Sequence, residues 1–103
     1  MGSSAKEQIT SQVKRRVEEL QRRSFADLEA LPEFDTQTVQ VANAIVTMTV
    51  YRTRRPDGHL LVVVQACRER LFGIYHNVFA EGFVASANGT RSEATEELLW
   101  DYT

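Results

Sequence analysis

The chain has 103 residues, of which 43% are hydrophobic and 25% charged; this composition is typical of one folded domain with a modest core and excludes global disorder. The net charge of −2 argues against a general binder of nucleic acid or of anionic membranes. The longest apolar run, Leu60 to Val64, is far shorter than a membrane span.

Cysteine content and the polar N-terminus indicate the compartment. Cys67 is the only cysteine, so neither an internal disulfide nor a cysteine-based zinc site can form within one chain. The first ten residues lack the apolar segment of a signal peptide. These features favour a cytoplasmic protein with a single domain over residues 1–103. We expect residues 1–4 to be disordered or an artificial leader, and we assign them no function.

Two helices are predicted at the start of the chain. Apolar residues recur there at spacings of three and four, as on one face of a helix: Ile9, Val13, Val17 and Leu20. This spacing predicts a helix from about Ala5 to Arg23. Ser24 has the character of an N-cap for a second, short helix, which Pro32 ends. Residues 33–37 are expected to be a linker.

A β-hairpin is the best-defined element of the sequence. Two strand-like runs, 44–53 and 60–68, flank Pro56-Asp57-Gly58, in which proline presets φ and glycine takes the positive φ that closes the turn. Counting outward from this turn places Val50 opposite Val64 and Thr49 opposite Gln65. The apolar run that follows the turn is typical of a central strand with both faces covered.

The remaining residues predict further strands and a last helix. Residues 72–87 are long for one strand, so they form either one bent strand or two, with a bulge or bend at Gly82. Asn88-Gly89 is a turn signal, and Thr90 is expected to cap a C-terminal helix. The predicted fold is α+β: an N-terminal helix plus a short helix, a three- to four-stranded antiparallel meander and a C-terminal helix, with the helices on one face of the sheet.

The hairpin register sorts the strand residues onto two faces. One face is apolar and is expected to pack against the helices; it holds Ala44, Val46, Met48, Val50, Val62, Val64 and Ala66, joined by Tyr75 and Phe79. The other face mixes apolar and polar side chains. Such a mixture suits a subunit interface or a ligand cradle. We therefore predict a partner- or ligand-binding face made of Thr49, Tyr51, Leu61, Val63, Gln65, Ile74, His76 and Val78.

Residues with catalytic chemistry are sparse. Cys67 and His76 are the sole candidates for a nucleophile and its base, and no third orienting group accompanies them. The two histidines lack carboxylate or cysteine partners at metal-ligand spacing. Hence the sequence predicts no catalytic residue, no metal site and no cofactor.

The leading functional hypothesis is a non-catalytic protein that associates with itself as a homodimer through the mixed face. The alternative is a small-ligand-binding protein or an enzyme that uses that face as a pocket, with Tyr51, Gln65 and His76 as its polar groups. A second alternative is RNA binding through the first helix, since residues 1–24 hold six Lys or Arg against three Glu. No stacking aromatics lie among these basic residues, which disfavours nucleic acid as a partner.

Overall fold

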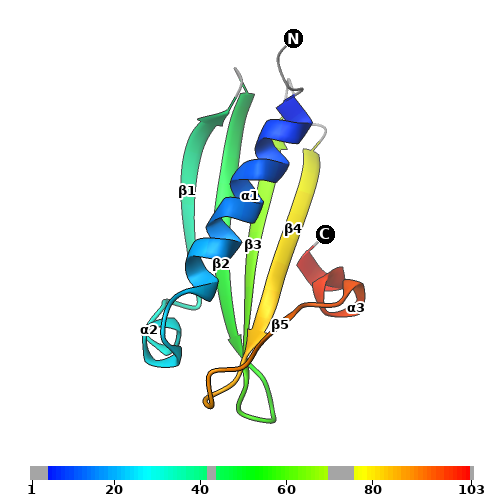
Figure 1. Ribbon diagram of the computed structural model, residues 1–103. Coiled ribbons are helices and arrows are strands. Elements are labelled where there is room, and N and C mark those ends of the chain that lie inside the picture. The colour runs from blue at the N-terminus through cyan, green and yellow to red at the C-terminus, as the bar shows by residue number, and fades with distance from the viewer. Residues whose placement is uncertain (1–4, 42–43, 70–75, 103) are drawn as a thin grey trace.

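A long helix lies across a five-stranded antiparallel sheet in the computed structural model, which describes residues 5–41, 44–69 and 76–102 (Figure 1). The elements in chain order are α1 (Ala5–Gln21), α2 (Phe25–Glu29), β1 (Phe34–Val41), β2 (Ala44–Arg54), β3 (Leu60–Glu69), β4 (His76–Ala85), β5 (Arg91–Glu93), α3 (Glu96–Leu99) and a 3₁₀ turn, η2 (Trp100–Tyr102). The strand order across the sheet is the order along the chain. The α+β class and the meander are therefore confirmed.

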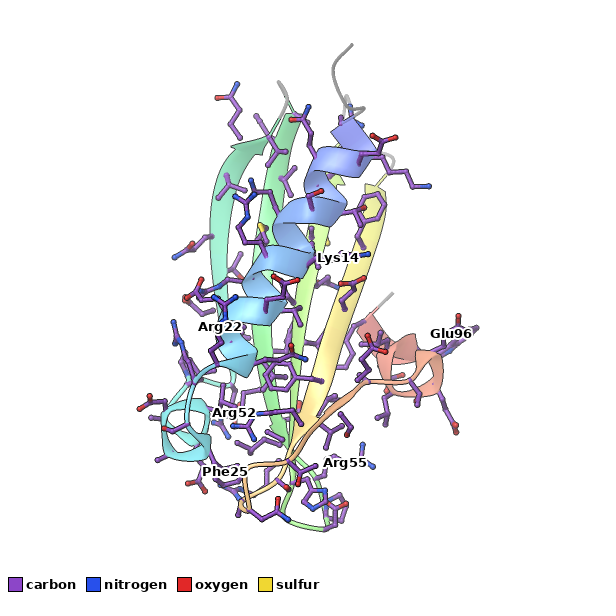
Figure 2. All side chains as sticks on the ribbon, viewed as in Figure 1. Lys14, Arg22, Phe25, Arg52, Arg55 and Glu96 are labelled. Atoms are coloured by element: carbon purple, nitrogen blue, oxygen red, sulfur yellow. The ribbon has the colours of Figure 1, made fainter. Side chains whose placement is uncertain are left out.

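Helix α1 packs the predicted apolar stripe against one face of the sheet. Its four stripe residues are buried in the core, and the helix ends two residues before the predicted boundary. Burying each such side chain contributes about 1.5–3 kcal/mol. Ser24 caps α2 as predicted, because its side chain accepts a hydrogen bond from the Asp27 N–H at 3.1 Å. Arg52 reaches from β2 toward α2, where its Nε donates to the Leu31 carbonyl at 2.8 Å (Figure 2).

The β2–β3 hairpin has the predicted register. Val50 pairs with Val64 and Thr49 with Gln65, and Gly58 has a φ of 87°. The predicted apolar face accordingly lies in the core with α1, where Phe79 joins it; Tyr75 lies outside the described residues. In β3, Leu60, Val62 and Val64 are buried toward α1, while Leu61 and Val63 are buried on the opposite face. Strand β3 is thus covered on both faces, as its apolar run predicted.

Gly58→Val should destabilise the domain by about 1–2 kcal/mol, because a β-branched residue is strained at a positive φ. A Cβ at Gly58 would meet no atom within 4 Å, so the expected loss comes from the backbone alone. Gly58→Asn is the matched control, since asparagine tolerates this conformation better. Urea denaturation of the two variants should give the smaller loss for asparagine; equal stabilities for valine and wild type would contradict the turn assignment.

The predicted linker at 33–37 is wrong, because Phe34–Val41 forms strand β1 at the edge of the sheet. Most of its side chains are exposed, and only Val39 and Val41 are drawn toward the core. An edge strand with water on much of both faces has no need of an alternating apolar pattern, so the sequence carries little sign of it.

The C-terminal helix begins later than predicted and lies elsewhere. Residues 91–93 form β5 beside β4, and the cap is Thr95, whose Oγ1 accepts from the Leu98 N–H at 3.3 Å. The chain then passes the edge of β4, so that Tyr102 reaches the sheet face opposite α1 (Figure 1). The helices therefore do not all cover one face. In β4 the pairing with β3 continues through Gly82 without a bulge. The described residues 76–85 therefore form one strand, not two.

Candidate functional site

The face of the sheet opposite α1, called the far face below, is closed near its middle by the end of this chain. The Gln65 Nε2 donates to the Tyr102 carbonyl at 2.6 Å, and the Tyr51 hydroxyl donates to the Gln65 Oε1 at 3.1 Å. The rings of Tyr51 and Tyr102 lie 5.1 Å apart, and the Tyr102 hydroxyl is 3.1 Å from the Thr53 Oγ1. The polar groups predicted to bind a partner or ligand thus bond to one another and to Tyr102.

The predicted apolar members of the far face are largely buried within a single chain. Val63 is fully buried, and Leu61 and Thr49 are each only 6% exposed. Thr49 also shares a 3.0 Å hydrogen bond with Thr36 of β1. Val78 is half-buried in β4, opposite Cys67. A second molecule would therefore contact the exposed edges of the far face rather than its buried centre.

Two predicted site residues lie wholly or partly outside the described part of the chain. Ile74 lies outside the described residues, and His76 opens β4 with its backbone opposite Glu69. The placement of these two side chains on the far face therefore stays a prediction.

The largest exposed apolar side chains lie where the sequence analysis assigned no function. Phe34 is 65% exposed, Ile45 57% and Trp100 77%. Phe34 and Ile45 border opposite ends of β1: Phe34 is its first residue, and Ile45 pairs with Gln40 near its last. Phe34 was missed because the strand that contains it was predicted to be a linker, and Ile45, although it lies in a predicted strand, gained a neighbour only once β1 was known to pair with β2.

Cys67 is not set up as a nucleophile. The thiol is half-buried, and burial raises its pKa, which keeps it in the unreactive protonated form. Its partner in β4 is Val78, two residues from His76. Nothing in the described residues activates this thiol.

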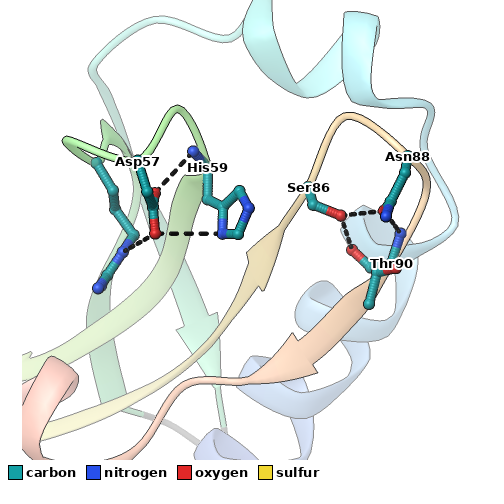
Figure 3. Close-up of polar contacts among 6 residues, drawn as sticks. Asp57, His59, Ser86, Asn88 and Thr90 are labelled. Carbon is teal, nitrogen blue, oxygen red and sulfur yellow. Dashed lines mark hydrogen bonds and ion pairs between the residues drawn. The ribbon is translucent and has the colours of Figure 1, made fainter.

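The tips of the β2–β3 and β4–β5 hairpins bring a histidine, a carboxylate and a hydroxyl to one end of the sheet (Figure 3). The backbone N–H of His59 donates to Asp57 at 3.0 Å and holds the pKa of that carboxyl below its usual range. The His59 Nδ1 lies 3.4 Å from the same carboxylate. His59 and Ser86 line one hollow of about 200 Å³.

This arrangement does not make a catalytic triad. The Ser86 Oγ bonds to the Asn88 side chain instead, and within the described residues no hydrogen bond joins Ser86 to His59. A nucleophile needs its base within hydrogen-bond reach. These contacts serve to fix the two turns.

The flank of α1 that faces β1 and β2 forms an open groove of about 330 Å³. Its floor is apolar, with Val39, Met48 and Val50, and its rim is polar: Gln12, Arg15, Arg16, Glu19, Asp35 and Gln37. Arg16 is held by Glu19 at 2.6 Å, which lowers the pKa of that carboxyl. Within the described residues, Arg15 and Asp35 form no ion pair, so one unpaired charge of each sign remains at the rim.

Other candidate sites are weaker. Among residues 5–41, 44–69 and 76–102, no group of three or more His, Cys, Asp or Glu is arranged to hold a metal ion. No helix in this part of the chain is long and apolar enough to cross a membrane. Glu19 of α1 pairs with Arg23 at 3.0 Å as well as with Arg16, whereas Lys14 is exposed on α1 and Arg22 is exposed just beyond its end (Figure 2).

No known protein family, curated protein or solved structure matches this chain.

Proposed function

We propose that the chain acts by association with a second copy of itself, as a non-catalytic homodimer. The observation that carries this proposal is strand β1, which has eight residues, forms one edge of the sheet and, among the described strands, pairs only with β2. The peptide groups on the open side of an edge strand are a template for another strand, and long edges left uncovered invite pairing. The exposed Phe34 and Ile45 beside it add apolar surface.

In this dimer the far face is part of the contact, but the main contact lies at the exposed edge strand β1. The middle of that face is occupied by Tyr102, whereas Thr36 and Thr38 of β1 are exposed. The proposal also includes a cytoplasmic location, which the single cysteine supports.

Ile45→Lys should shift the protein from dimer to folded monomer. The side chain is already more than half exposed in one chain, so the lysine costs the fold little, but two charges would be brought into the contact. Sedimentation equilibrium over a range of concentrations measures the change. Trp100→Lys is the matched control: it replaces an even more exposed apolar residue, in η2 rather than beside β1, and should leave the dimer intact. A wild-type protein that stays monomeric at high concentration would refute association.

A second candidate function is the binding of a small amphipathic molecule in the groove beside α1. The supporting observation is an apolar floor beneath one unpaired arginine and one unpaired carboxylate, in a space at the lower end of the range for ligand sites. A chemical-shift screen with short-chain carboxylates tests it: shifts confined to Val39, Met48 and Val50 that disappear in Arg15→Gln would favour this function. RNA binding has less support, because Arg16 and Arg23 are both engaged in ion pairs with the Glu19 carboxylate.

A further inference from the structure

Resting on the proposed homodimer, we infer that the contact is antiparallel pairing between β1 of one copy and β1 of the other, with Gln37 on the two-fold axis. The axis runs perpendicular to the sheet, so both α1 helices lie on the same side of one continuous ten-stranded sheet. Within such a pair, residues that face each other point to the same face of the sheet, and the residue on the axis faces its own counterpart.

The composition of β1 permits this pairing. The strand contains no proline and one charged residue, Asp35. It therefore lacks the prolines and multiple charges that commonly prevent an edge strand from pairing with another chain. Centring the pair on Gln37 uses residues 34–40, nearly the whole strand. The opposite edge is less suited, because β5 covers one end of β4 and the Gly82 carbonyl accepts the Ala94 N–H at 3.0 Å.

The apolar residues at the two ends of β1 complement each other in this register. Phe34 lies opposite Gln40 of the second copy, and the neighbour of Gln40 on its other side is Ile45. Phe34 of one copy and Ile45 of the other therefore flank the same glutamine on the far face. Because the axis repeats this arrangement, Phe34 and Ile45 of each copy lie on the same face as those of the other, two strands apart with Gln40 between them, and the same surface of both copies is used, as a two-fold interface requires.

The charges are also compatible. Asp35 lies opposite Val39 of the second copy, and Val39 lines the groove that carries Arg15 and Arg16. The pairing thus brings a carboxylate toward two guanidinium groups, and no like charges face each other along β1. This arrangement selects a second copy of this chain over an arbitrary strand.

Disulfide trapping tests the register directly. In antiparallel pairs, facing Cα atoms lie about 4.5–5.5 Å apart, and a disulfide needs about 4.4–6.8 Å. Gln37→Cys in a Cys67→Ala background should therefore form a covalent dimer of twice the chain mass on mild oxidation, and reduction should reverse it. Thr36→Cys and Thr38→Cys are the controls: alone, each faces the other position rather than itself and should stay unlinked, but a mixture of the two should cross-link.

The outcomes separate this inference from the proposed function. Cross-linking of Gln37→Cys and of the mixed pair, without linkage of either control alone, supports the register. If the wild type is a dimer but the Gln37→Cys variant does not link, or only the Thr36→Cys or Thr38→Cys variant links with itself, the inference is overturned and the homodimer stands. A monomeric wild type overturns both, and then β1 is free for a strand from another protein. Circular dichroism of each reduced variant shows that it is folded.

Discussion

Val63→Lys should unfold the domain, with an expected loss on the order of 4 kcal/mol or more. Val63 lies at the middle of the predicted binding face, yet it is fully buried in a single chain, with Tyr51 and Gly82 as its neighbours across the sheet. A lysine there has no carboxylate opposite it and must either be buried as an unpaired charge or lose its proton. A domain of this size has a total stability of about 5–15 kcal/mol, so the variant should be largely unfolded in mild urea.

Thr47→Lys is the matched control for Val63→Lys. Thr47 lies on the same far face but is only half-buried, so a lysine can extend its amino group to water. Urea denaturation followed by circular dichroism should give a small loss for Thr47→Lys. If Val63→Lys were instead a folded monomer of near wild-type stability, the far face would be open in the monomer and Tyr102 would not close it.

Gly82→Ala is expected to cost about 3 kcal/mol although it adds one methyl group. A Cβ at Gly82 would meet the Val62 carbonyl oxygen and would lie 3.1 Å from the Val63 Cα. Backbone atoms cannot turn aside as a side chain can, so β4 would have to move away from β3. The Gly82 carbonyl also accepts the Ala94 N–H, and the shift would therefore disturb the crossing of the C-terminal segment.

Val84→Ile adds the same methyl group on the same face of β4, at a half-buried position. Its thermal unfolding midpoint should stay close to that of the wild type, while that of Gly82→Ala falls by several degrees or more. Equal midpoints for the two variants would mean that β4 can separate from β3 at Gly82 at little cost.

The hairpin shows how far local sequence determines this fold. Gly58 accepts a backbone conformation that other residues avoid, and once it is placed, the pairing of residues 46–54 with residues 60–68 follows by counting. The assignment of Val62 and Val64 to the core required nothing beyond that register and the stripe on α1.

Features that depend on contacts between distant segments could not be predicted in the same way. Strand β1 is held by pairing with β2 rather than by an apolar pattern of its own, so its residues resemble a linker. The position of Tyr102 depends on its contacts with Thr53 and Gln65, 49 and 37 residues away. Consequently the sequence predicted which residues make up the far face but not what covers it, and it gave no indication of the exposed rim at Phe34 and Ile45.

The strictly sequential strand order has a consequence for how the molecule folds. Every described strand pairs with its neighbour in the chain, so the sheet can assemble by pairing successive strands that are close together in the sequence. The contacts of Tyr102 bridge far longer stretches and become available only after β2 and β3 have paired. We therefore expect the C-terminal segment to dock last in refolding and to detach first in local opening, which would transiently uncover the centre of the far face without loss of the sheet.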